Sequence, residues 1–305
     1  MKTTHVLAIL LAVSFLVNIG IIAAYVPSEG QVQDLIAKTN ALSMQNMQLQ
    51  QQLDTANLSI QGSSCSLEYY RNRLSQTGPN GTTLPPAIEG TATMIAPSVS
   101  QAVETVRNGP FLQQVVIMNG TLMNISVTAQ PGQGRVLVQT TPLMGIVFQD
   151  AANTAVYVAQ NRTGLDLSGT DILFSIQADK EVSAVDGPSA GALMTLLTIA
   201  ALEHRTIDPT LTLTGTIDQN GHVGAIGGAV EKATAAKNFG LKRFLLPQEN
   251  AKLTTYNQQI VNYRGFQLVD YVPKTVEAKS YIQQNAGIDV TYINSIGDVI
   301  ALALR

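Results

Sequence analysis

The chain has 305 residues, which is enough for one or two domains with a sizeable core. Its formal net charge of -3 provides no basic surface for phosphates, so a nucleic-acid partner is not expected. The single cysteine, Cys65, excludes an internal disulfide framework and a cysteine-rich zinc site. We therefore expect no bound metal or cofactor on this chain.

Residues 1–27 are predicted to be an N-terminal membrane anchor. Residues 6–26 are almost wholly apolar, and this run is long enough to cross a bilayer as a helix. A cleaved signal peptide is the alternative, although the run exceeds a usual signal-peptide core and lacks a clean A-x-A cleavage site. Lys2 precedes the run, whereas Glu29 and Asp34 follow it. This charge bias favours a single-pass membrane protein whose body lies outside the cytoplasm.

Residues 28–77 are predicted to form a helical coiled-coil stalk, followed by a linker at residues 78–90. The stretch contains a seven-residue (heptad) repeat, and Asn46 occupies position a of that repeat, where a polar residue helps to fix register and oligomeric state. A lone glutamine-rich helix or a disordered stalk is the alternative, because residues 45–52 are low in complexity. The heptad residues are Val32, Thr39, Asn46, Leu53 and Ile60 at a, and Leu35, Leu42, Leu49 and Ala56 at d.

Residues 91–305 are predicted to form one mixed domain. Residues 91–140 alternate apolar and polar side chains, which predicts β-strands joined by hairpin turns at residues 119–120 and 132–134. The mixed order of elements indicates an α+β, or two-layer α/β, fold. The further elements expected are helices at residues 143–160, 190–204, 252–261 and 275–285, and strands at residues 171–177, 244–246 and 267–271.

Ser189 lies at the predicted start of the helix at residues 190–204, after a turn-forming Asp-Gly-Pro sequence. One interpretation is a plain N-cap, in which the hydroxyl accepts a backbone N–H bond. The other is a nucleophile whose neighbouring N–H groups, at the positive end of a helix dipole, hold a developing oxyanion. The second interpretation requires a base that removes the hydroxyl proton.

The histidines are poor candidates for that base. His5 lies before the apolar run, His204 ends the helix several turns from Ser189, and His222 lies in a turn where a solvated loop histidine is expected. Lys232 is the better candidate, because small apolar residues surround it on a helix that follows a glycine-rich segment, and such surroundings favour the neutral amine. A surface lysine paired along its helix is the alternative.

Together, these segments resemble the proteolytic domain of the Lon-type serine peptidases, which use a Ser-Lys dyad. The family's nucleophile lies in a Lys-Asp-Gly-Pro-Ser-Ala-Gly motif, which residues 185–191 match except at Val185. The family's base lies in a Pro-Ile-Gly-Gly-x-x-Glu-Lys motif, which residues 225–232 match except at Ala225. Between them the family has Thr-Gly-Glu-Ile, and residues 214–217 (TGTI) retain the threonine.

This resemblance, which covers about residues 90–250, implies a Lon-like fold for residues 91–305 and a serine endopeptidase that forms an acyl-enzyme. It implies that Ser189 is the nucleophile, that Lys232 is the base and that Thr214 orients the lysine. It also implies polypeptide substrates and assembly into a homo-oligomer. The supporting positions that it implies in the nucleophile turn are Asp186, Gly187, Pro188, Ala190 and Gly191.

The sequence has no Walker A pattern of G-x-x-x-x-G-K-[ST], so we expect action without ATP bound to this chain, on flexible peptides or unfolded segments. Two other classes of function stay open. One is a catalytically silent Lon-like scaffold anchored in the membrane, favoured by the departures at Val185, Thr216 and Ala225. The other is a membrane-anchored sensor or adhesin that binds a ligand at the glycine-rich segment of residues 224–228.

Overall fold

The computed structural model of the chain describes residues 85–305, except residues 109–110, 142, 179–183, 186 and 264–265. The predicted anchor and stalk, and the linker up to residue 84, lie outside the described residues. Within the described part of the chain, no helix combines the length and apolar character needed to cross a membrane.

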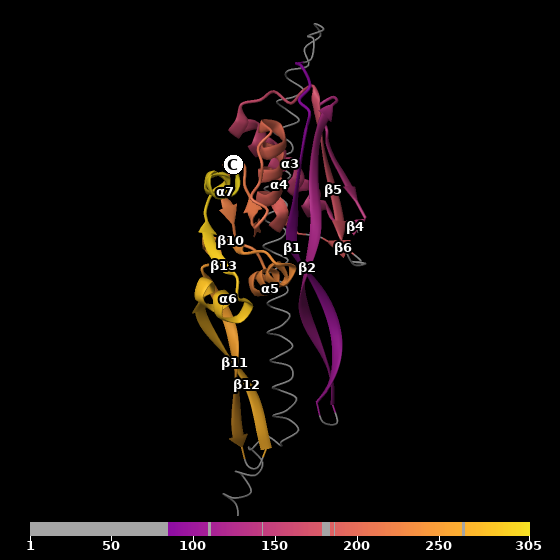
Figure 1. Cartoon of the computed structure of the whole chain (residues 1–305). Coiled ribbons are helices and arrows are strands. Elements are labelled where there is room, and N and C mark those ends of the chain that lie inside the picture. Colours follow the sequence, from indigo (N-terminus) through magenta and orange to yellow (C-terminus); the bar gives the residue numbers. More distant parts are fainter. Residues whose placement is uncertain (1–84, 109–110, 142, 179–183, 186, 264–265) are drawn as a thin grey trace, which may run out of the picture. The chain divides into compact units, whose positions relative to one another are not determined.

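The elements in chain order, labelled as in Figure 1, are β1 (Gly90–Asn108), β2 (Phe111–Pro131), β3 (Val136–Thr140), β4 (Leu143–Met144), α3 (Ile146–Thr163), β5 (Thr170–Ala178), β6 (Ala184–Val185), the 3-10 turn η1 (Pro188–Ala190), α4 (Gly191–Glu203), β7 (Leu211–Leu213), β8 (Thr216–Ile217), β9 (Val223–Gly224), α5 (Ala229–Phe239), β10 (Arg243–Pro247), the 3-10 turn η2 (Gln248–Asn250), β11 (Lys252–Tyr263), β12 (Phe266–Glu277), α6 (Ala278–Ala286), β13 (Asp289–Ile293) and α7 (Ile296–Ala303).

A four-stranded sheet with the order β1-β2-β5-β3 carries the larger hydrophobic core. β1 and β2 pair antiparallel, as do β2 and β5, whereas β3 runs parallel to β5. Ile125, Val127 and Ala129 alternate along β2 and are buried, as the period of a strand with one covered face predicts. The same core contains residues of α3 and α4, which lie beside one another in Figure 1.

Helix α4 is buried on every side. All of its residues from Gly191 to Leu202 are buried, because β1, β2, α3 and α7 all contact it. The hydroxyls of Thr195 and Thr198 donate to helix carbonyls four residues earlier, so neither threonine leaves a polar group unpaired in the core. A helix that is apolar all round is stable only inside a core. The turn η1 at its N-terminus is therefore attached to the interior of the domain.

A second, parallel sheet with the order β13-β10-β7 links this core to a smaller one. Leu245 on the central strand β10 belongs to the larger core, whereas its neighbours Phe244 and Leu246 belong to the smaller core with residues of α5 and α6. Burial on both faces is typical of parallel strands. Strand β10 therefore lies between the two cores and fixes their separation.

The predicted hairpin turn at residues 119–120 is wrong. β2 runs unbroken through this dipeptide, with Asn119 paired to Ser100 and Gly120 paired to Val99. Gly120 also has no positive φ, which a two-residue hairpin turn of this type needs. Glycine serves a different purpose there, because a Cβ added to Gly120 would lie 2.1 Å from the carbonyl oxygen of Glu231 on α5.

The predicted helix at residues 252–261 is also wrong, because this segment is strand β11 in a hairpin with β12. Its sequence, KLTTYNQQIVNY, is rich in β-branched and aromatic residues, which favour an extended chain. The predicted strand at residues 267–271 is confirmed as part of β12, and the helix predicted at residues 275–285 corresponds to α6. The helices predicted at residues 143–160 and 190–204 correspond to α3 and α4, and the strand predicted at residues 171–177 lies within β5.

Asp171 on β5 is a buried carboxylate that stabilises the turn between β2 and β3. It is 1% exposed, and it accepts hydrogen bonds from the backbone N–H groups of Gln133 (2.7 Å) and Arg135 (2.8 Å) and from the Arg135 guanidinium. Burial alone would raise the pKa of Asp171, but the hydrogen bonds from Arg135 and Gln133 outweigh it and lower the pKa to about 2.

We expect Asp171→Ala to lower the free energy of unfolding by about 2 kcal/mol at pH 7, because two backbone N–H groups lose their acceptor. The pKa of Asp171 is lower in the folded chain than in the unfolded chain, where it is about 3.9. The stabilisation by the Asp171 carboxylate is therefore complete above about pH 3.9 and is lost as the pH falls towards 2. Urea unfolding of parent and variant at pH 7 and pH 3 measures the difference. Equal unfolding midpoints of parent and variant at pH 7 would contradict this expected loss of stability.

Candidate active site

Ser189 lies in η1, directly before α4, as the sequence predicts for a residue at a helix start. The N-cap of α4 is Ala190, and no side-chain hydrogen bond caps this helix. The Ser189 hydroxyl instead faces the amine of Lys232, with 2.9 Å between Oγ and Nζ. The structure therefore does not support the interpretation of Ser189 as a plain N-cap.

The backbone of Ser189 is attached to the end of β7. Its carbonyl oxygen accepts from the backbone N–H of Gly215 (2.8 Å) and from the Thr214 hydroxyl (3.1 Å). In return, the Ala192 N–H donates to the Gly215 carbonyl at 3.0 Å. A Cβ added to Gly191 would lie 2.8 Å from Cγ2 of Ile217, so this close approach requires a glycine. The Ser189 turn and the segment carrying Thr214 thus form one hydrogen-bonded unit.

Lys232 lies in α5 and is 2% exposed. Its Nζ contacts Oγ of Ser189 and, at 3.2 Å, Oγ1 of Thr214, which is itself buried. Burial lowers the pKa of Lys232 to about 8. An amine with this pKa is partly neutral near physiological pH and can accept a proton. The alternative of a surface lysine paired along its helix is therefore wrong.

The structure places the predicted supporting residues around this contact with one exception. Gly187 is extended before η1, Pro188 and Ala190 lie within η1, and Gly191 begins α4. Asp186 lies outside the described residues. No group of three or more His, Cys, Asp or Glu side chains that could hold a metal ion occurs among the described residues.

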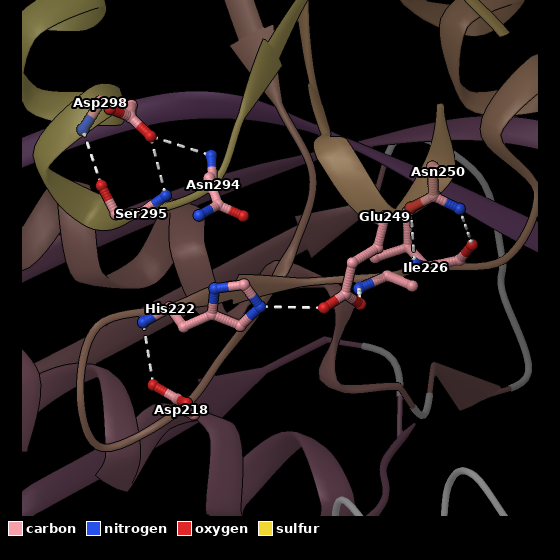
Figure 2. A network of polar contacts seen from close by, with 9 residues as sticks. Asp218, His222, Ile226, Glu249, Asn250, Asn294, Ser295 and Asp298 are labelled. Atoms are coloured by element: carbon pink, nitrogen blue, oxygen red, sulfur yellow. Dashed lines mark hydrogen bonds and ion pairs between the residues drawn. The ribbon is translucent and has the colours of Figure 1, made fainter. Parts of the chain in front are cut away.

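Two residues that contact the loop before Lys232, Glu249 and Asn250, were not singled out from the sequence. His222 is paired with Glu249, with 2.9 Å between Nε2 and Oε1, so it is not simply a solvated loop histidine. The hydrogen bond between these two side chains raises the pKa of His222 and lowers the pKa of Glu249. Glu249 and Asn250 bind the backbone of Ala225 and Ile226, which leads into α5 (Figure 2). A sequence gives no local signal for such bonds, because their partners are 24 positions apart.

Comparison with known proteins identifies a peptidase domain family that resembles this chain. The sequence model of the Lon protease (S16) C-terminal proteolytic domain matches residues 112–280. A Lon protease of Phenylobacterium zucineum is 35% identical over 138 residues, which cover 44% of this chain and 17% of that protein. The Lon protease 2 of Desulfotalea psychrophila is 31% identical over 165 residues, which cover 52% of this chain and 21% of that protein.

The Lon protease 1 of Thermus thermophilus is 35% identical over 136 residues, which cover 43% of this chain and 17% of that protein. The chain therefore spans about a fifth or less of the length of these relatives. The domain match, however, includes more than half of the chain and contains Ser189, Thr214 and Lys232. The chain belongs to the family of the Lon protease (S16) C-terminal proteolytic domain.

Proposed function

We propose that this protein is a serine endopeptidase that hydrolyses flexible or unfolded polypeptides through a Ser189–Lys232 dyad. The observation that carries the proposal is the 2.9 Å contact between Nζ of Lys232 and Oγ of Ser189, made by a lysine that is 2% exposed. Among the described residues, burial alone accounts for the lowered pKa of this lysine, since no acidic side chain contributes. A buried amine without a charge partner among these residues destabilises a fold, so its presence beside a serine favours a chemical role.

In the first step, neutral Lys232 accepts the hydroxyl proton of Ser189 while Oγ forms a bond to the scissile carbonyl carbon. The Thr214 hydroxyl accepts a hydrogen bond from Nζ at 3.2 Å and so holds the amine in line. Backbone N–H groups of the turn around Ser189, near the positive end of α4, stabilise the oxyanion. When the C–N bond breaks, the Lys232 ammonium protonates the leaving amine. Water then attacks the acyl-enzyme with the same lysine as base.

The finer parts of the proposal concern ATP, the membrane and assembly. We propose that peptide cleavage needs no ATP on this chain, because the sequence contains no Walker A pattern. The apolar run of residues 6–26 supports a membrane anchor that places residues 91–305 outside the cytoplasm. The heptads between residues 32 and 60 support a homo-oligomer.

The test is hydrolysis of unfolded casein and of a fluorogenic peptide set by the purified full chain, with and without ATP, beside Ser189→Ala. We expect cleavage that is indifferent to ATP and absent in the variant. Because Lys232 must be neutral, labelling of Ser189 by a fluorophosphonate should accelerate with pH around a midpoint near 8.

Three outcomes would contradict the proposal in different ways. Equal cleavage by Ser189→Ala would exclude Ser189 as the nucleophile. Strict dependence on ATP would contradict the ATP-independent part alone. Absence of both cleavage and labelling in the folded full chain would favour the silent scaffold, for which the replacements at Val185, Thr216 and Ala225 are the specific observation.

A further inference from the structure

The loop of residues 224–228 leads into α5 and therefore determines where Lys232 lies. Its own sequence does little to fix it, since three of its five residues are glycine. Gly228, the N-cap of α5, has a φ of 65° and provides no side-chain cap hydrogen bond. Ala225 and Gly227 are exposed. The position of the loop must therefore depend on groups outside it.

Two neighbouring side chains of η2 provide these groups (Figure 2). Asn250 accepts from the Ile226 N–H through Oδ1 and donates to the Ile226 carbonyl through Nδ2, both at 2.9 Å. Glu249 accepts from the Ala225 N–H through Oε2 at 2.9 Å, and its other oxygen contacts Nε2 of His222 at 2.9 Å. Because the Asn250 amide binds both the N–H and the carbonyl of Ile226, it fixes the distance of the Ile226 backbone from η2 and also the orientation of that backbone. Asn250 is 8% exposed, so water competes little for these bonds.

The strand before η2 also supports the other side of the dyad. Leu245 on β10 accepts from the backbone N–H of Thr214 at 3.2 Å and pairs with Leu213 on β7. Thr214 and its neighbour Gly215 in turn hold the carbonyl oxygen of Ser189. β10 with η2 is therefore a common support. It fixes Thr214 and the Ser189 turn through its middle, and the loop before Lys232 through its end.

We infer that Asn250 and Glu249 are positioning residues that set Nζ of Lys232 against Oγ of Ser189 by holding the backbone of residues 225–226. The inference rests on the proposed dyad and adds the device that keeps its base in place. If these side chains release the loop, the start of α5 can move, and Nζ becomes accessible to water. A displacement of about 1 Å is enough to lower a rate by about 100-fold.

The test compares Asn250→Asp with the parent full chain. This change keeps the shape and the acceptor but replaces the donor to the Ile226 carbonyl with an oxygen that repels it. Asn285→Asp is the matched control, because Asn285 also donates its amide to a backbone carbonyl, that of Tyr281, on the exposed surface of α6. Glu249→Ala is the second variant, since Glu249 is half exposed and its loss should not prevent folding.

Two readouts are measured from pH 6 to 11, alongside the melting temperature. One is the rate at which a fluorophosphonate labels Ser189. The other is trace acetylation of Lys232 by acetic anhydride, followed by mass spectrometry, which gives the titration midpoint of the amine whether or not the protein is a peptidase. We expect Asn250→Asp to lower the limiting labelling rate by about 10- to 100-fold. We also expect its Lys232 midpoint to move up towards the ordinary value of about 10.4.

Glu249→Ala should change both readouts in the same direction by a smaller amount, and Asn285→Asp should leave both at the parent values. A lower melting temperature with parent labelling and a parent Lys232 midpoint in the folded variant would overturn the inference, because the role would then be structural only. If the parent itself shows no Ser189 labelling, the proposed function fails. The Lys232 midpoints still decide whether Asn250 and Glu249 position the amine.

Discussion

A Lys232→Met variant is expected to lose peptide hydrolysis by about 1,000-fold or more and yet to be more stable than the parent chain. The loss of activity follows from removal of the base in the proposed dyad. The gain in stability follows from burial of the amine, which lowers its pKa from 10.5 to about 8. At about 1.4 kcal/mol for each pKa unit, keeping this ammonium folded at neutral pH opposes folding by roughly 3 kcal/mol.

The sign of the pH dependence follows from the same shift. Between about pH 8 and pH 10.5 the unfolded chain binds more protons at this lysine than the folded chain does, so the stability of the parent rises with pH in that window. Methionine removes this effect but also the hydrogen bonds to Ser189 and Thr214, each worth about 1 kcal/mol. The net gain expected at pH 7 is about 1 kcal/mol. Above pH 10.5 only the loss of the two hydrogen bonds remains, so the variant should be less stable than the parent by about 2 kcal/mol.

Guanidinium unfolding at pH 7 and at pH 10.5 measures this difference, with fluorogenic peptide turnover recorded on the same samples. Lys237→Met is the matched control, because Lys237 lies in the last turn of the same helix and is exposed. It should keep its activity and gain no stability. A Lys232→Met variant that is less stable than the parent at pH 7 would show that the buried ammonium is compensated in the folded protein.

A Gly120→Ala variant is expected to lose about 100-fold in peptide turnover and about 1–3 kcal/mol in free energy of unfolding, although Gly120 is no part of the proposed dyad. The added Cβ would lie 2.1 Å from the carbonyl oxygen of Glu231 and 3.1 Å from the Cβ of Ala235. Because the nearest atoms are helix backbone, relief requires α5 to move away from β2. Lys232, the residue after Glu231, moves with it.

Gly297→Ala provides the control for this change, since the Cβ there would meet only Oγ of Ser295, at 3.4 Å. Turnover and unfolding midpoints of the two variants and the parent are compared under identical conditions. Parent-like turnover in Gly120→Ala would contradict the dependence of the base on this close approach. A stability loss in Gly297→Ala equal to that of Gly120→Ala would assign the effect to glycine replacement in general.

The sequence was sufficient to predict the elements whose signal is local. The apolar run after Ser189 predicted α4, because the character of its own side chains favours a helix there. The small residues around Lys232 left both a neutral amine and a surface lysine open. The contact of Ser189 with Lys232 was expected only through the resemblance to the Lon family. No periodicity brings together residues that are 43 positions apart.

The first error arose because one residue type can serve two purposes. Gly120 follows an asparagine, as in a hairpin turn, but its small size permits the approach of α5 to β2. Residues 252–263 form a strand that pairs with residues 266–277, and the β-branched and aromatic residues of the segment were a local signal for a strand that the helix prediction did not use. The bonds of Asn250 and Glu249 to residues 225–226 were missed because their partners are 24 positions apart.

The burial of α4 implies that the two sides of the proposed dyad, α4 after Ser189 and the loop before Lys232, exchange amide hydrogens on different timescales. No residue of α4 from Gly191 to Leu202 has an exposed face, so its N–H groups should exchange only through opening of the larger core. Ala225 and Gly227 are exposed, and side-chain hydrogen bonds hold that loop, so a local fluctuation is enough to release it. Warming the protein should therefore move the Lys232 amine away from Ser189 while Ser189 remains in place. The resulting state is inactive but still folded, and its activity should return rapidly on cooling.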